Sequence, residues 1–220
     1  MQPRARFHGV VLTAGALLVG VAGSQHPLLM GDGAAQLGAI ADMPLWRTVH
    51  WTIAFGYVLV VAGLTGVWTQ LAASPGAGAA RTGMFISLFG YLTDLVGVMF
   101  MLGAAAALAD AYRAGEPGLS ATHAIFVFDM IHPAARAALR IGAFAVSIGL
   151  IGFGWGVVGS AVFPRWLGWA GVWGGAVGVV VAVVLPATSP YVIAGVGLAT
   201  VWQLAAGVTL LRSAGSLKES

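Results

Sequence analysis

Histidine and carboxylate side chains of the kind that bind metals occur close to the ends of several apolar stretches. The predicted ligands are His26, His50, Asp129 and His132, with His123 as a further candidate. Neutral imidazoles with carboxylates or thioethers suit copper, and nitrogen and oxygen ligands alone also suit zinc or iron. Asp129 and His132 are three residues apart, so on a helix they share a face. We predict a metal site with copper favoured; the alternative is that these side chains are only solvated.

The same histidines offer a second cofactor, a single haem b. Bis-histidine ligation between two helices is a common way for a helical bundle to hold haem. His50 and His132 are the candidate pair, whereas His8 is the only histidine predicted on the opposite side of the membrane. Two haems stacked across the bilayer therefore cannot be assembled from this chain, and one haem stays an alternative to the metal ion.

A polar stripe interrupts one of the apolar stretches. Ser87, Tyr91 and Asp94 are spaced so that they share one face of a helix, and this face should point into the bundle. An unpaired charge at that depth costs about 2.5 to 3.5 kcal/mol, so Asp94 is expected to be protonated, paired or hydrated. Arg140 is the nearest candidate cation by depth. Asp94 is thus either the coupling residue of a small proton or cation transporter or a structural tie between helices.

The elements that must position these residues are apolar helices. Of the 220 residues 59% are hydrophobic and 8% charged, against about 45 to 50% and about 25% in soluble chains. The sequence therefore excludes a soluble enzyme and predicts an all-α fold, a polytopic transmembrane helix bundle that forms one integral membrane domain over residues 1–220. The predicted spans are 9–23, 45–73, 82–109, 133–162, 166–185 and 191–211.

Two of the connecting segments are predicted to form short amphipathic helices. They cover residues 33–43 and 120–132, and Ser120 is the expected N-cap of the second. Pro133 fits the first turn of the transmembrane helix that follows. We expect both short helices to lie in the membrane interface on the side of the histidines.

The basic residues predict how the chain is oriented. Cytoplasmic loops carry an excess of lysine and arginine, so the more basic side is expected to be cytoplasmic. The side of the chain ends carries Arg4, Arg6, Arg81, Arg165, Arg212 and Lys218. The opposite side carries Arg47, Arg113, Arg136 and Arg140. We therefore expect both termini in the cytoplasm of a bacterium, with the chain in its inner membrane and the histidine set on the outer side.

Residue types that are rare or missing exclude several kinds of chemistry. The chain has no cysteine, so disulfides, thiolate zinc sites and cysteine-ligated iron–sulfur clusters are excluded. Lys218 is the only lysine, which leaves no Walker A lysine for a nucleotide and no buried amine for a Schiff-base cofactor. The scattered arginines form no stripe that could follow a nucleic acid. No motif assigns a reaction, and whether the protein is an enzyme stays open.

Glycines at four-residue spacing suggest close helix packing. Such small-residue faces let two helices approach within one chain or between subunits. The glycine-rich fourth and fifth spans therefore pack on each other or, alternatively, mediate a homo-oligomer or a larger membrane complex. In the second case the protein would be a non-catalytic or haem-bearing subunit of a membrane redox assembly. The pairs are Gly152 with Gly156, Gly171 with Gly175, and Gly174 with Gly178.

Two short motifs resemble those of a family of uncharacterised six-helix bacterial inner-membrane proteins. The first is the connection 163–169, which reads Phe-Pro-Arg-Trp-Leu-Gly-Trp. The second combines His26-Pro27 in a long first outer loop with Trp-Arg-Thr-Val-His at 46–50. The resemblance spans most of the chain and implies a six-helix fold in the lipid bilayer. It implies no activity.

Overall fold

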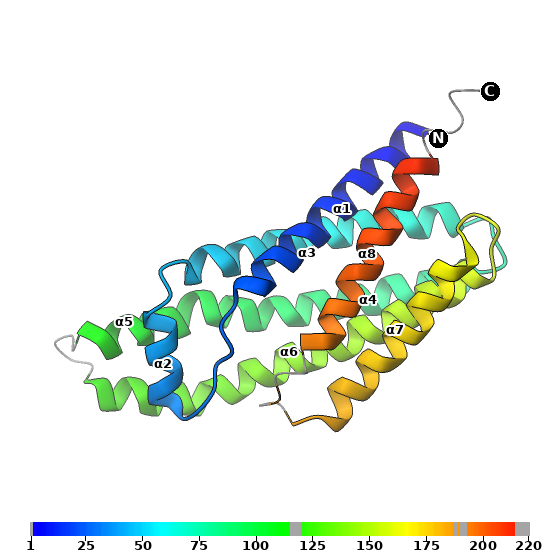
Figure 1. Cartoon of the computed structure of the whole chain (residues 1–220). Helices are drawn as coiled ribbons and strands as arrows, with labels where there is room; N and C mark the ends of the chain where they lie inside the picture. The colour runs from blue at the N-terminus through cyan, green and yellow to red at the C-terminus, as the bar shows by residue number, and fades with distance from the viewer. Residues whose placement is uncertain (1, 115–119, 187–188, 190–192, 214–220) are drawn as a thin grey trace.

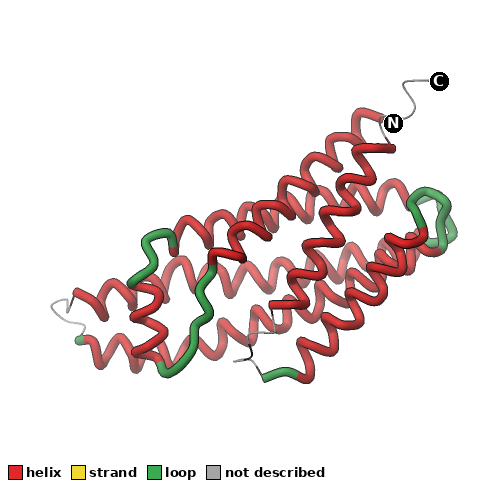
Figure 2. Tube along the Cα trace, viewed as in Figure 1, coloured by secondary structure: helices red, strands yellow, loops and turns green. Residues whose placement is uncertain are grey.

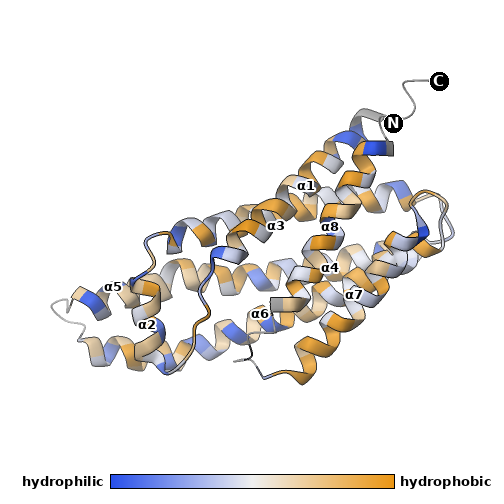
Figure 3. Cartoon of the chain, in the orientation of Figure 1, coloured by the Kyte–Doolittle hydropathy of each residue, from blue (hydrophilic) through white to orange (hydrophobic). Residues whose placement is uncertain are grey.

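The computed structural model describes residues 2–114, 120–186, 189 and 193–213 (Figure 1). Every regular element in this part of the chain is a helix, and the connections are short (Figure 2). Six helical segments are long and apolar enough to cross a membrane, and hydrophobic residues cover most of their visible length (Figure 3). The predictions of an all-helical fold and of six such segments are confirmed.

The long helices follow one another with two short helices, α2 and α5, and one π-helical turn among them. α1 covers Gln2–Gln25, α2 Gly33–Ala41, α3 Trp46–Leu71 and α4 Ala77–Phe100. The π-helical turn η1, Met101–Ala105, joins α4 to α5, Ala106–Ala114. α6 covers Ala121–Val158, α7 Arg165–Val184 and α8 Ile193–Ser213. α1 begins and α8 ends at the same end of the molecule (Figure 1). Residues 191 and 192, where the sixth span was expected to start, lie outside the described residues.

The fourth predicted span begins in the wrong place. α6 is one continuous helix of 38 residues in which Pro133 is internal, whereas the sequence predicted a new helix there. Proline removes the helical hydrogen bond to the carbonyl four residues earlier, and membrane helices tolerate this loss. Ser120 is the N-cap of the whole helix, since its Oγ accepts the backbone N–H of His123 at 3.3 Å. At about 1.5 Å per residue α6 is about 57 Å long, well beyond a hydrocarbon core of about 30 Å.

Glycine faces hold α6 against two neighbours. Gly152 of α6 lies against Gly83 of α4, and an added Cβ would come within 2.8 Å of the Gly83 Cα. Gly171 and Gly175 of α7 face the other side of α6, where an added Cβ would meet Gly154 or the Ser147 carbonyl. The described glycine faces are therefore used within the chain, and the pair Gly152 and Gly156 packs on α4 rather than between the fourth and fifth spans. Assembly with other subunits stays a prediction.

A small second core lies at the end of the molecule where α2 packs across α5 and the first turns of α6 (Figure 1). Its buried side chains include Leu37, Ile40 and Phe128. Asp32 is the N-cap of α2 and accepts the backbone N–H of Ala35 at 2.9 Å. Trp46, at the start of α3, belongs to the same core.

Candidate functional site

A cavity of about 290 Å³ lies among α1, α3, α4 and α6 and the chain segment that follows α1. Its walls are mostly apolar, formed by residues such as Val19, Ile53, Val98 and Leu139. An apolar cavity into which a few polar groups converge is a default candidate for a ligand site. Its ionisable lining residues are His26, His50, Tyr57, Asp94, His132, Arg136 and Arg140.

Two histidines from different parts of the chain meet in this cavity. The Nε2 atoms of His26 and His50 are 3.2 Å apart, and the ring centroids are 4.9 Å apart. His50 stands one turn into α3 and is 2% exposed, whereas His26 directly follows α1. α1 lies close to α3 because glycines such as Gly15 and Gly56 let their backbones touch. The pair is therefore a product of helix packing, not of local sequence.

Backbone carbonyls determine which ring nitrogens carry the protons. The Nδ1 atom of His50 lies 2.8 Å from the Trp46 carbonyl oxygen, and that of His26 lies 2.7 Å from the Pro27 carbonyl oxygen. A carbonyl can only accept a hydrogen bond, so each Nδ1 carries a proton, and in a neutral ring the Nε2 atom then keeps its lone pair. Both Nε2 lone pairs then face each other across 3.2 Å. Such an arrangement is favourable only if a proton or a metal cation lies between the two nitrogens.

The spacing of the two nitrogens suits adjacent ligands of one ion. Two metal–nitrogen bonds of about 2.0 to 2.1 Å at the tetrahedral angle place their nitrogens about 3.3 to 3.4 Å apart, whereas ligands on opposite sides of an ion are about 4 Å apart. Metal-binding histidines commonly donate their second N–H to a backbone carbonyl, as both rings do here. Burial lowers the pKa of His26, and the hydrogen bond to Pro27 opposes that shift only in part. The neutral, metal-binding form of this ring is therefore favoured.

The other predicted ligands are placed differently. His132 lines the same cavity, is 4% exposed, and packs its ring against Phe100 and Phe128 with centroids 6.0 and 4.4 Å away. Asp129 is exposed, and its carboxylate lies beside Gly33 at the start of α2, outside the cavity lining. His123 is exposed next to Ser120. Across the described residues no group of three or more histidine, aspartate and glutamate side chains could hold a metal ion.

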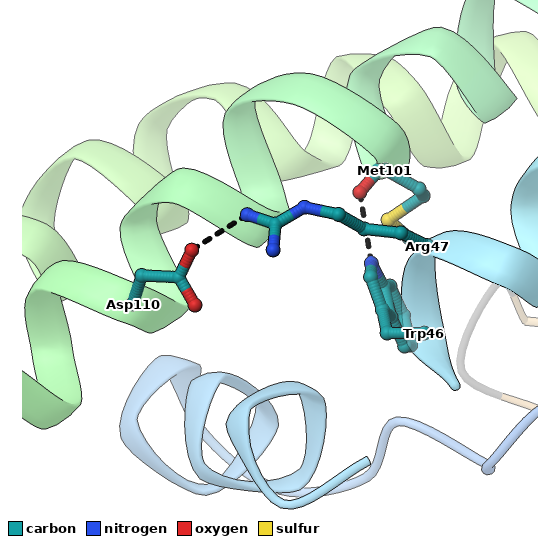
Figure 4. Close-up of polar contacts among 4 residues, drawn as sticks. All are labelled: Trp46, Arg47, Met101 and Asp110. Atoms are coloured by element: carbon teal, nitrogen blue, oxygen red, sulfur yellow. Dashed lines mark hydrogen bonds and ion pairs between the residues drawn. The ribbon is translucent and has the colours of Figure 1, made fainter. Parts of the chain in front are cut away.

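Trp46 is a site residue that the sequence analysis placed in a motif but did not predict at the site. Its ring centroid lies 4.2 Å from that of His50 and 5.1 Å from that of His26. Its indole Nε1 donates a 2.9 Å hydrogen bond to the Met101 carbonyl, at the π-helical turn (Figure 4). Tryptophan near a helix end is typical of the membrane interface, but the four-residue spacing of Trp46 and His50 on one helix face was a signal for a shared role.

The polar stripe of α4 is buried, as its spacing predicted. Ser87, Tyr91 and Asp94 are 2, 5 and 3% exposed. The Tyr91 hydroxyl accepts a hydrogen bond from the Gln203 amide of α8, and the Asp94 carboxylate lies against Gly142 of α6 and lines the cavity. In the described part of the chain no cation lies within ion-pair distance of Asp94. Its carboxyl group is thus a buried ionisable group without a charged partner.

Arg140, the expected partner of Asp94, has other contacts. Its guanidinium donates to the carbonyl oxygens of Ala182 and Val183, at 2.5 and 3.0 Å. These carbonyls belong to the last turn of α7, where the helix dipole favours a positive charge. Arg140 therefore ties α6 to the end of α7.

The described residues form an all-helical bundle with six helices of membrane-spanning length and a cavity lined by a histidine pair. Comparisons with protein-family models, with curated proteins and with solved structures found no match to this chain. The family resemblance of the two sequence motifs therefore stays a prediction, and the function has to be argued from the site itself.

Proposed function

We propose that this is an integral membrane protein that binds a transition-metal ion through His26 and His50. The observation that carries the proposal is the 3.2 Å separation of the two Nε2 atoms, combined with the carbonyl contacts of both Nδ1 atoms. Together they leave two lone pairs that converge on one point, at the spacing of adjacent ligands of a tetrahedral ion.

Copper is the favoured ion. Thioethers are soft ligands that select Cu(I), and the methionines Met30 and Met101 line the same cavity as the two histidines. The chain has no cysteine to compete with them. His132 is a further donor on the cavity wall, provided that its ring leaves its packing against Phe128.

The insertion of the chain in a membrane, and its orientation there, are part of the proposal. Large apolar side chains are exposed along the long helices, among them Phe89 at 58% and Met99 at 68%, and a bilayer would cover them. The distribution of lysine and arginine supports cytoplasmic termini in a bacterial inner membrane. The histidine pair would then face the outer side, where a metal ion could enter from outside the cell.

The test is metal titration of the purified protein in a neutral detergent after removal of metals with EDTA. The wild-type chain should bind one copper ion, and His26→Ala or His50→Ala should lower the affinity by about tenfold or more. His123→Ala is the matched control, because it removes an exposed histidine outside the cavity. A wild-type protein that binds neither copper nor zinc, or variants that bind as tightly as the wild type, would contradict the proposal. An absorption spectrum of the same sample tests the haem alternative through its Soret band.

A second candidate function is proton- or cation-coupled transport through Asp94. It is supported by the position of this carboxyl group, which is 3% exposed, lines the cavity and has no cation near it in the described part of the chain. Intramembrane ionisable residues commonly mark ion pathways. Liposome flux that is abolished by Asp94→Asn, in a protein that binds no metal, would favour this function over metal binding.

A further inference from the structure

Arg136 is a half-buried cation on the cavity wall whose charge has no partner among the described residues. The other arginines near this end of the molecule have partners: Arg47 pairs with Asp110, Arg113 with Asp42, and Arg140 binds two carbonyls. Arg136 has neither a hydrogen bond nor an ion pair in the described part of the chain, although it lines the cavity. Charged groups inside membrane proteins are normally paired. An unpaired guanidinium that faces a cavity therefore points to an anionic ligand.

The surroundings of Arg136 leave its guanidinium free to bind such a ligand. Asp94 lines the same cavity but is outside ion-pair distance of every described cation, so it forms no ion pair with Arg136. The planar guanidinium presents parallel N–H donors that match a carboxylate or a phosphate in a bidentate contact. A lysine would not offer this fork, and Arg136 therefore favours a planar or branched oxyanion.

The rest of the cavity is suited to a short hydrocarbon chain. Its apolar lining includes Val19, Ile53, Val98 and Leu139, and Leu139 lies three residues beyond Arg136 on α6. A volume of about 290 Å³ equals that of about ten water molecules in the liquid, at about 30 Å³ each. A ligand of about ten non-hydrogen atoms fits this space.

We propose that the cavity binds an amphiphilic organic anion, a medium-chain monocarboxylate, with its carboxylate on Arg136 and its chain against the apolar wall. This inference goes beyond the proposed metal site and does not depend on it, because Arg136 and the apolar wall are present whether or not an ion is bound. The observation that supports this inference is that one cavity contains both a cation without a partner and an apolar space of the size of a short hydrocarbon chain.

The experiment measures binding of octanoate by calorimetry to metal-free protein in a neutral detergent. Octanoate should bind saturably, and two analogues separate the contributions of its parts: octanol has the chain without the charge, and acetate has the charge without the chain. Because hydrogen bonds to charged groups are lost, Arg136→Gln should weaken octanoate binding by about tenfold or more. Arg136→Lys should bind with intermediate affinity, since it keeps the charge and loses the fork.

Arg47→Gln is the control, because it removes a guanidinium that pairs with Asp110 outside the cavity. Octanoate binding should be unchanged in this variant, and because it is measured on metal-free protein the result does not depend on the metal proposal. The inference is overturned if the wild type shows no saturable octanoate binding, if Arg136→Gln binds octanoate as the wild type does, or if octanol binds as tightly as octanoate. Arg136→Gln is expected to fold, since no hydrogen bond is lost, and its thermal unfolding provides the check.

Discussion

The indole of Trp46 donates its N–H to the main-chain oxygen of Met101, across a distance of 2.9 Å, at the residue where α4 passes into a π-helical turn. A change of hydrogen-bond register at such a turn makes a carbonyl available to a donor outside the helix, and π-helical turns occur frequently at functional sites. Here the contact holds the start of α3 against the continuous helical segment Ala77–Ala114, which runs from α4 through η1 to α5. It also sets the Trp46 ring beside both histidines of the proposed metal site.

Trp46→Phe should therefore destabilise the protein and weaken metal binding at the proposed site. The variant keeps an aromatic ring but leaves the buried Met101 carbonyl without its donor, which should lower the free energy of unfolding by about 1 to 3 kcal/mol. Thermal unfolding and copper titration measure the two effects. Trp51→Phe is the control, because that ring is 66% exposed. Equal stability of Trp46→Phe and the wild type would show that the hydrogen bond has no structural role.

The sequence predicted the helices better than it predicted their contacts. Apolar composition and stretch length identify six membrane-length helices because these signals are local, and the Ser120 N-cap is local as well. Pro133 was misread as a helix start because proline is common there, whereas the packing of α6 on α4 and α7 supports an unbroken helix.

Which residues form the site was harder to predict. Asp129 and His132 share a stretch of α6, yet Asp129 faces the start of α2 while His132 faces the cavity. The partner that reaches His50 is His26, which is 24 residues away and comes from the chain beyond α1. Its approach depends on how α1 lies along α3, and no pattern within either segment encodes that tertiary contact. Arg136 was counted only as a topology marker, because its lack of a partner is visible only once the neighbours are placed.

Asp94→Asn should leave the stability unchanged or raise it. The carboxyl group has no cation within ion-pair distance in the described part of the chain, so the neutral amide of the same shape loses no ion pair. If the carboxyl is ionised, removing its charge relieves part of the cost of burying it. Tyr91→Phe is the comparison, because it removes the acceptor of the buried Gln203 amide and should cost about 1 to 3 kcal/mol. Thermal unfolding in detergent measures both variants, and a clear loss in Asp94→Asn would reveal a partner for the carboxylate.

Arg113→Gln should loosen α2 without changing global stability. Arg113 donates to the Ala41 carbonyl at 2.6 Å and to the Asp42 carboxylate, so it ties the end of α2 to α5. An exposed ion pair contributes about 0 to 1 kcal/mol, which corresponds to amide exchange in residues 36–42 that is faster by up to about fivefold. Hydrogen-exchange mass spectrometry measures the change, and high salt should reduce the difference from the wild type. Arg47→Gln is the matched control on α3. Identical amide exchange of α2 in Arg113→Gln and the wild type would show that Arg113 does not hold α2 to α5.

Gly83→Ala should destabilise the bundle, whereas Gly197→Ala should not. A Cβ on Gly83 would lie 2.7 Å from the Gly149 carbonyl oxygen and 2.8 Å from the Phe153 nitrogen, and these are backbone atoms of α6 that no side-chain rotation can move. Forcing α4 away from α6 is an overpacking change that costs about 1 to 3 kcal/mol. Gly197 in α8 has no atom within 4 Å of an added Cβ, and alanine there should raise helix stability by about 0.5 to 1 kcal/mol. Thermal unfolding of the two variants in the same detergent should therefore move the midpoint in opposite directions. A Gly83→Ala protein as stable as the wild type would mean that α4 and α6 are farther apart than their glycine faces indicate, and the cavity between them would then be wider as well.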